Sequence, residues 1–170
     1  MSMALERKRI LIVDDEPDVL ETLGELLDMC VIDYARNCAT AERLIQENTY
    51  DAAILDIMGV DGYKLLKLAK DKDMPALMLT AHALSPDHLL KSIKGGAFSY
   101  IPKEEMVEIA FYLDDMIRAR FNDDRKSQNW FRKLSPIFDK KFGSDWQIKH
   151  KKALIDLDLT HTREELEEIL

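Results

Sequence analysis

Several polar residues of this 170-residue chain stand directly after short apolar runs. A strand that is buried on both faces of a parallel sheet reads as a continuous apolar run, so the polar residue that ends it lies at the rim of the sheet. Three of these residues are carboxylates, one carries a hydroxyl and one carries an amine, which are groups that bind cations or phosphates. They are Asp14, Asp15, Asp56, Thr80 and Lys103.

The three carboxylates need a cation if they share one crevice, because such close negative charges cannot all stay ionised alone. A hard divalent ion, Mg²⁺ or Mn²⁺, suits oxygen ligands, and Mg²⁺ needs only one or two carboxylates besides water. A metal ion and a lysine neutralise phosphoryl oxygens, and carboxylates are known to form aspartyl phosphates. The residue types therefore predict transfer of a phosphoryl group onto a carboxylate.

The elements that would position these residues alternate along the first part of the chain. Continuous β-rich runs predict strands, and apolar residues at helical spacing predict helices between them. This alternation indicates an α/β fold in which helices cover both faces of a parallel sheet. The expected strands are residues 9–13, 31–35, 51–56, 75–81 and 97–101, and the expected helices lie within residues 16–27, 40–47, 62–70, 85–94 and 106–120.

The order of the strands decides which of the polar residues meet. In a five-stranded parallel sheet of order 2-1-3-4-5, strands one and three are neighbours, and the functional crevice lies at the carboxyl ends of the strands. Asp14, Asp15 and Asp56 are therefore expected in one small crevice. Lys103 would reach into it from the other side, and Thr80 would offer a hydroxyl.

Residues 8–121 resemble the receiver domain of bacterial two-component response regulators. The resemblance rests on four segments, ILIVDDEP, AAILD, LMLTA and SYIPK, which follow the order of the family at roughly its spacing. It implies a flavodoxin-like doubly wound fold, with Asp56 accepting a phosphoryl group from a histidine kinase or a phosphotransfer protein. The chain would then be a signalling phosphoacceptor and not an enzyme, capable at most of self-phosphorylation and self-dephosphorylation.

The resemblance also implies roles for the residues around the acceptor, which would itself be a Mg²⁺ ligand. Asp15 would bind Mg²⁺ directly, Asp14 would act through water, and the backbone carbonyl of Met58 would be a further ligand. Lys103 would bind the phosphoryl group.

The same resemblance implies a switch made of Thr80 and Tyr100. Both side chains would move on phosphorylation and change the surface of the fourth helix, the fifth strand and the fifth helix. That surface, or the C-terminal part of the chain, would then bind a downstream protein or a second copy of the chain.

Two loops depart from the pattern of the family. The loop from Asp56 to Gly62 is two residues shorter than usual and lacks a proline. Met58 and His82 would flank the phosphoryl group, and because a hydrophobic Met58 cannot orient water, we expect a long-lived phosphoryl group. No proline follows Lys103, so a trans bond and a reshaped loop are expected there, since a non-proline cis bond costs about 2.5–4 kcal/mol.

The C-terminal part of the chain differs in pattern from the receiver-like part. We expect a receiver domain at residues 1–121, a polar linker at residues 122–129 and an all-helical extension at residues 130–170. The extension is predicted to contain a helical hairpin with Gly143 as a C-cap.

Two capping boxes are predicted in the extension, at Ser144 with Gln147 and at Thr162 with Glu165. Its aromatic side chains would pack on the receiver or within the hairpin, or would form a dimer or partner surface. These residues are Trp130, Phe131, Phe138, Phe142 and Trp146.

Composition narrows the range of partners. The formal charge is −8, from 24 basic and 32 acidic residues, and an acidic chain is a poor polyanion binder. The two cysteines show no metal-binding spacing and read as ordinary thiols of a reducing cytoplasm. No apolar stretch approaches the roughly 20 residues that span a bilayer, so a cytoplasmic protein without membrane contact is expected.

Two alternative functions stay open. The extension could belong to a transcriptional regulator, but residues 121–170 hold ten basic and ten acidic side chains, so nucleic acid is not the expected partner. The chain could also be a pseudo-receiver, an interaction module that is never phosphorylated. The intact acidic trio and the lysine argue against that second alternative.

Overall fold

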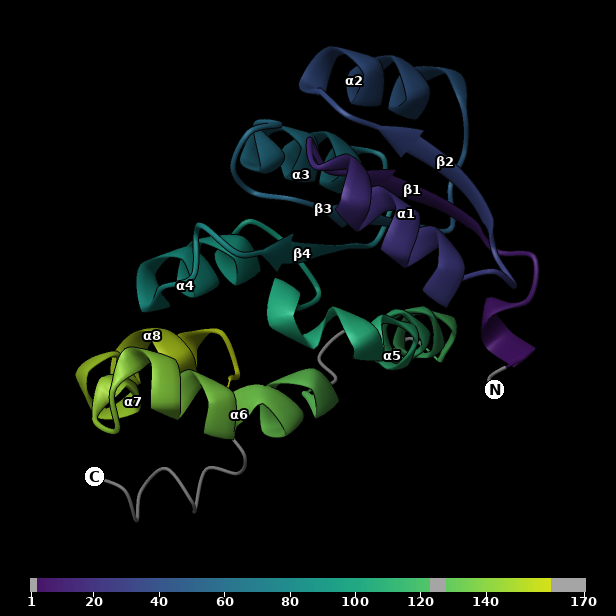
Figure 1. Cartoon of the computed structure of the whole chain (residues 1–170). Coiled ribbons are helices and arrows are strands. Elements are labelled where there is room, and N and C mark those ends of the chain that lie inside the picture. Colours follow the sequence, from purple (N-terminus) through teal and green to yellow (C-terminus); the bar gives the residue numbers. More distant parts are fainter. Residues whose placement is uncertain (1–2, 123–127, 160–170) are drawn as a thin grey trace.

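A five-stranded parallel sheet forms the centre of the computed structural model, which describes residues 3–122 and 128–159 (Figure 1). The strand order is β2-β1-β3-β4-β5, and every neighbouring pair is parallel, which confirms the predicted fold. The strands are β1 (Arg9–Val13), β2 (Val31–Ala35), β3 (Ala52–Leu55), β4 (Ala76–Thr80) and β5 (Tyr100–Pro102).

Helices follow each strand. Right-handed crossovers place α1 on one face of the sheet and α2, α3 and α4 on the other, because the connection from β1 to β2 runs opposite to the later ones. The helix α5 contacts α1 and so shares its face. The helices of this part are η1 (Met3–Leu5), α1 (Pro17–Leu26), α2 (Cys38–Glu47), α3 (Gly62–Asp71), α4 (Pro86–Lys94), η2 (Lys103–Glu108) and α5 (Ile109–Phe121).

Local sequence accounts for several helix starts. Pro17 and Pro86 occupy the first turns of α1 and α4, where a missing N–H costs nothing. The side chains of Asn37 and Ser85 accept hydrogen bonds from backbone N–H groups and so cap α2 and α4. The predicted starts at Pro17 and Ser85 are thus confirmed, whereas α2 begins at Cys38, two residues before its expected start.

β5 begins at Tyr100 and not at the expected residue 97, and the segment after it also differs from its prediction. The fifth helix was expected from residue 106, but residues up to Glu108 form the 3-10 helix η2, and α5 begins only at Ile109. The peptide bond after Lys103 is trans, as expected, and no cis bond occurs among the described residues.

The C-terminal extension is helical as far as the structure describes it. Its helices are α6 (Asn129–Phe142), α7 (Trp146–Lys149) and α8 (Lys151–Asp156), and Gly143, with φ of 98°, ends α6 as predicted. They lie beside α4 and α5 (Figure 1). Their aromatic side chains join the hydrophobic core of the receiver part.

The capping box predicted at Ser144 is wrong. The helix α7 begins at Trp146 and has no side-chain cap. The amide of Gln147 instead donates to Asp139, 3.0 Å away, beside the indole N–H of Trp146 at 2.8 Å. The capping box predicted at Thr162 and Glu165 lies outside the described residues. In the described parts of the chain, every helix falls short of the length and apolar character needed to cross a bilayer.

Candidate functional site

The carboxyl ends of the strands bring the predicted polar residues to one rim. Asp14 and Asp56 follow Val13 and Leu55, which are direct partners in the ladder of β1 and β3. The Asp56 N–H donates to the Val13 carbonyl at 2.9 Å, so the backbone ladder itself sets these two carboxylates side by side. The site is therefore a consequence of strand register.

Lys103 joins the carboxylates of this rim. Its ammonium lies 2.8 Å from Oδ2 of Asp14, 2.9 Å from Oε1 of Glu16 and 3.6 Å from Oδ2 of Asp56. Lys103 is 9% exposed, Asp14 2% and Asp56 4%, while Glu16 lies at the solvent edge. A buried lysine with three acidic neighbours provides a fixed positive charge beside Asp56.

Burial controls the charges of these groups. Loss of solvent, followed by the nearby Asp14 carboxylate, raises the pKa of Asp56 to about 6. Burial likewise raises the pKa of Asp14, although Lys103 opposes this rise. For Lys103, burial lowers the pKa, but its hydrogen bonds to Asp14 and Glu16 outweigh burial and raise the pKa overall. The rim holds more negative charge than one lysine neutralises.

The surplus negative charge fits a divalent cation. Carboxylate oxygens of Asp14, Asp15 and Glu16 lie within 4.8 Å of one another. All are hard oxygen donors, and the exposed Asp15 leaves room for the water ligands that Mg²⁺ retains. Asp56 does not belong to this close cluster, and it is linked to the cluster through Lys103.

The short loop after Asp56 packs against the acidic cluster. A Cβ placed on Gly59, whose φ is 86°, would lie 2.5 Å from Oδ2 of Asp15. The peptide that joins Met58 to Gly59 therefore lies beside Asp15. This placement suits the predicted role of the Met58 carbonyl as a ligand, which stays a prediction.

Glycine also closes this loop at its far end. The Gly62 N–H donates to the Ile57 carbonyl at 3.0 Å, and a Cβ on Gly62 would overlap the backbone carbonyl of Asp56. Asp61 adopts the left-handed conformation with φ of 55° just before α3 begins. The Ile57 N–H donates to Oδ1 of Asp56 at 3.0 Å, so the loop holds the carboxylate in place.

A hydrogen-bonded path links Thr80 to Tyr100. The hydroxyl of Thr80 accepts the Ala83 N–H at 3.0 Å, and the Ala83 carbonyl accepts the Tyr100 hydroxyl at 2.5 Å. The Ser85 N–H donates to the same hydroxyl at 3.1 Å. Thr80 and Tyr100 are both fully buried, so the two predicted switch residues share one backbone segment.

Met58 and His82, which were predicted to tune the lifetime of the phosphoryl group, are both exposed at this rim. Half of the Met58 side chain is accessible, at 50%. His82 interacts electrostatically with Glu16. Their effect on lifetime stays a prediction.

Sequence reasoning missed three participants. Glu16 was given no role in the site, although it directly follows the two aspartates and binds Lys103. Gly59 has no predicted role, and its contact with Asp15 is apparent only in the structure. Ala83 was not considered, and no signal in the sequence marks a backbone group that bridges two side chains.

A family model for the response regulator receiver domain matches residues 10–110. The chain belongs to this family. The fold is thus that of a receiver domain.

Relatives and solved structures agree with this assignment. The chain is 32% identical over 130 residues to "Two-component response regulator ORR21" of Oryza sativa subsp. indica, a match that covers 71% of this chain and 18% of the relative. It is 36% identical over 107 residues to "Two-component response regulator ARR10" of Arabidopsis thaliana, covering 59% of this chain and 19% of the relative. Each of these matches covers less than a fifth of the length of the plant protein.

Solved structures match the receiver part. A response regulator structure from Clostridium difficile has a TM-score of 0.61 at 27% identity, covering 68% of this chain and 99% of its own. A response regulator structure described as putative, from Chloroflexus aurantiacus J-10-fl, has a TM-score of 0.60 at 30% identity, covering 66% and 99%. Both matches leave about a third of this chain unmatched.

Proposed function

We propose that Asp56 accepts a phosphoryl group from a histidine kinase or a phosphotransfer protein. The observation that carries this proposal is the buried ammonium of Lys103, placed between Asp14 and Asp56 at the ends of β1 and β3. Asp14, Asp15 and Glu16 would hold Mg²⁺ or Mn²⁺ beside the acceptor. The protein would act in the cytoplasm, where such donors are found.

The transfer follows from the geometry of the rim. A carboxylate oxygen of Asp56 attacks the phosphorus of a phosphohistidine, a P–O bond forms, and the P–N bond breaks. The leaving imidazole nitrogen keeps the electron pair and takes up a proton from water. The ammonium of Lys103 lies where it can neutralise a phosphoryl oxygen on Asp56. When bound, the metal ion would supply further positive charge to the phosphoryl oxygens.

The role of this chain is to hold the phosphoryl group and to respond to it. Thr80 would turn its hydroxyl toward the phosphoryl group and release Ala83. Tyr100 would follow, because its hydroxyl binds the Ala83 carbonyl. No second substrate is needed for this response, so the chain would be a signalling protein whose chemistry is limited to Asp56.

Incubation with radiolabelled acetyl phosphate and Mg²⁺ tests the proposal. We expect label on Asp56, a complete loss in Asp56→Ala and in excess EDTA, and a strong loss in Lys103→Ala. The matched control is Asp61→Asn, an acid of the same loop whose replacement tolerates the left-handed backbone. Label that persists in Asp56→Ala would refute the acceptor. Absence of label from the folded protein would support the pseudo-receiver alternative.

The transcriptional alternative has its own test. Short generic duplex DNA at low salt should not shift the mobility of the phosphorylated chain, because the C-terminal part has no net charge. A shift that weakens steeply with salt would favour that alternative.

A further inference from the structure

The C-terminal helices cover one particular receiver surface, formed by η2, β5 and α5. The helix α6 lies along it in the antiparallel sense, because contacts from the start to the end of α6 step backwards through α5 and η2. The pairs are Asn129 with Asp115 at 2.9 Å, Lys133 with the ring of Phe111 at 4.9 Å, and Lys141 with Glu104 at 3.4 Å. We call α6, α7 and α8 the tail and this surface the tail-docking surface.

The centre of this contact is Tyr100. Its ring centre lies 6.0 Å from that of Phe138 in α6, and neither residue is exposed to solvent. Phe138 in turn contacts the rings of Phe131, Phe142 and Trp146, which form an aromatic cluster of the tail. The proposed switch residue of the receiver is thus in direct contact with the tail.

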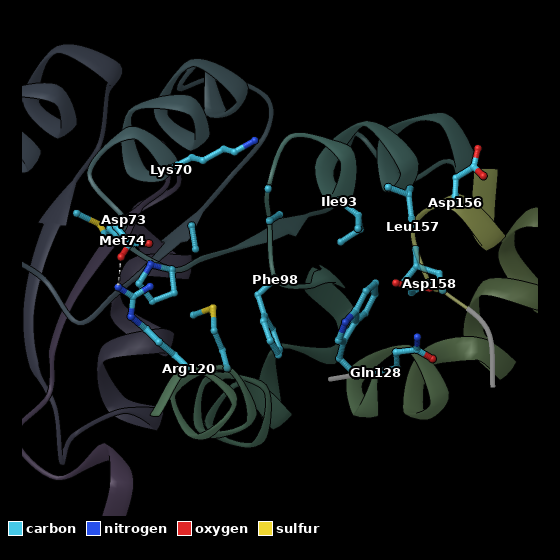
Figure 2. A pocket seen from close by; sticks show the side chains of 17 residues that line it. Lys70, Asp73, Met74, Ile93, Phe98, Arg120, Gln128, Asp156, Leu157 and Asp158 are labelled. Carbon is cyan, nitrogen blue, oxygen red and sulfur yellow. Dashed lines mark hydrogen bonds and ion pairs between the residues drawn. The ribbon is translucent and has the colours of Figure 1, made fainter. Parts of the chain in front are cut away.

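The contact is incomplete where the start of α6 and the end of α8 face the receiver. A cavity of about 500 Å³ lies between the receiver and the tail, beside the start of β4 and opposite the phosphoacceptor rim (Figure 2). Phe98 and Arg120 line it from the receiver, and Trp130 and Leu157 line it from the tail. Arg120 forms an ion pair with Asp73 of the receiver, at 2.9 Å.

We infer that the tail is the resting occupant of the tail-docking surface and that phosphorylation of Asp56 weakens its hold. This inference rests on the proposed function, because it needs the phosphoryl group at Asp56. When Thr80 turns toward that group, the Ala83 N–H loses its acceptor. The Ala83 carbonyl then shifts with the Tyr100 hydroxyl, and the Tyr100 ring moves against Phe138. Closely packed rings have few alternative arrangements, so this movement of Tyr100 disrupts its packing on Phe138. The tail then dissociates from the receiver.

The coupling must act in both directions. If the phosphoryl group weakens the docking of the tail, then loss of docking strengthens binding of a phosphoryl mimic by the same factor. Coupling of this kind amounts to about 5- to 150-fold in affinity. A substitution in the tail, far from Asp56, should therefore change the affinity of the site at Asp56 for a phosphoryl mimic.

Tryptophan fluorescence reports the tail directly. Both tryptophans of the chain, Trp130 and Trp146, belong to the tail, and each is 1% exposed. We expect beryllium fluoride with Mg²⁺, added to the full chain, to shift tryptophan emission to longer wavelength. Asp56→Ala should show no shift. The heat of binding, measured by calorimetry on the same samples, shows whether beryllium fluoride is bound at Asp56. This measurement does not depend on the position of the tail.

The reciprocal test uses a surface charge. Lys141→Glu places like charges next to each other at the Glu104 contact. Both side chains are nearly half exposed there, so we expect the variant to fold as the parent does. We expect the variant to bind beryllium fluoride several-fold more tightly. The matched control is Lys140→Glu, with the same charge change at a neighbouring exposed position, which should bind as the parent does.

The outcomes separate the two proposals. Binding heat at Asp56 without a change in tryptophan emission would overturn the inference and leave the proposed function standing. Equal affinities in Lys141→Glu and Lys140→Glu would also overturn it. Absence of both binding heat and acetyl phosphate labelling would refute the proposed function, and the inference with it.

Discussion

Asp56 lies 4% exposed beside a second carboxylate, and this position raises its pKa to about 6. An exposed aspartate has a pKa of about 3.9. The difference comes first from burial and then from Asp14. A carboxylate held at this raised pKa in the absence of a metal ion stores unfavourable energy, which a cation or a phosphoryl group with its metal can relieve.

Asp56→Asn should therefore stabilise the metal-free protein at neutral pH. Between pH 4 and pH 6, folded Asp56 binds more protons than unfolded Asp56, so the wild-type free energy of unfolding falls as pH rises through this window. The variant avoids this loss and should gain about 1–3 kcal/mol at pH 7.5 but little at pH 4. Urea unfolding in EDTA at both pH values measures the gain. An equal gain at both values would contradict the explanation, and the exposed acid Asp61, replaced by Asn, is the control.

Met58→Asn should shorten the lifetime of the phosphoryl group. Met58 is half exposed at the rim and offers no polar atom to orient water, whereas an asparagine amide can do so. We expect hydrolysis to be at least about tenfold faster, a typical effect of a positioned polar group. Loss of label after removal of the phosphodonor measures the rate. Hydrolysis of the parent within seconds, unchanged by the substitution, would contradict the role of Met58.

At the scale of elements, the loop between β3 and α3 is the part most closely fitted to the site. It is short, so its two glycines must each meet a neighbour at close range: Gly59 meets Asp15, and Gly62 meets the Asp56 backbone. A loop of this kind links the acceptor strand to the acidic cluster without the proline that the family usually has.

Gly59→Ala should weaken Mg²⁺ binding by about tenfold, or about 1.4 kcal/mol. Its Cβ would displace Asp15, whose oxygen lies 2.5 Å from the position of that atom. Gly143→Ala is the matched control, because its φ of 98° imposes the same backbone strain while the nearest atom lies 3.5 Å away. Calorimetric titration with Mg²⁺ compares the two variants. Similar Mg²⁺ affinities in the two variants would contradict the displacement of Asp15 by the added methyl group.

At the scale of the whole molecule, the tail shares a core with the receiver. Tyr100 of β5 and Phe138 of α6 are both fully buried against each other. The division into residues 1–121, 122–129 and 130–170 was predicted from sequence pattern alone. Because the two larger parts share a core, they are separate domains only if they unfold independently of each other.

Receiver and tail should unfold in one transition when Asp56 is unmodified. The shared core makes the tail lose its packing when the receiver unfolds, which is the condition for two-state behaviour. Tryptophan emission follows the tail, and far-UV circular dichroism follows mainly the receiver helices. Both should give the same urea midpoint. A tryptophan transition at clearly lower urea would show that the tail is an independent unit.

The parts of this protein that the sequence determines are those set by local pattern and by backbone ladders. Apolar runs predict the strands, the residue after each run lies at the rim, and parallel pairing brings Asp14 and Asp56 together. The start of α1 follows from Pro17 in its first turn, and the start of α4 follows from the cap at Ser85 and from Pro86. The main errors in the elements, the start of α5 and the cap at Ser144, arise at element ends, where tertiary contacts compete with local preference.

Tertiary structure alone decides which side chains meet across the molecule. Glu16 binds Lys103 over a separation of 87 residues, and no local period encodes such a contact. The same holds for the bridge through Ala83 and for the docking of Phe138 on Tyr100. An aromatic residue at helical spacing predicts a buried face but not the surface that it covers, because burial is non-directional. The sequence thus determines the proposed phosphoacceptor site, and the packing of the tail determines what that site would control.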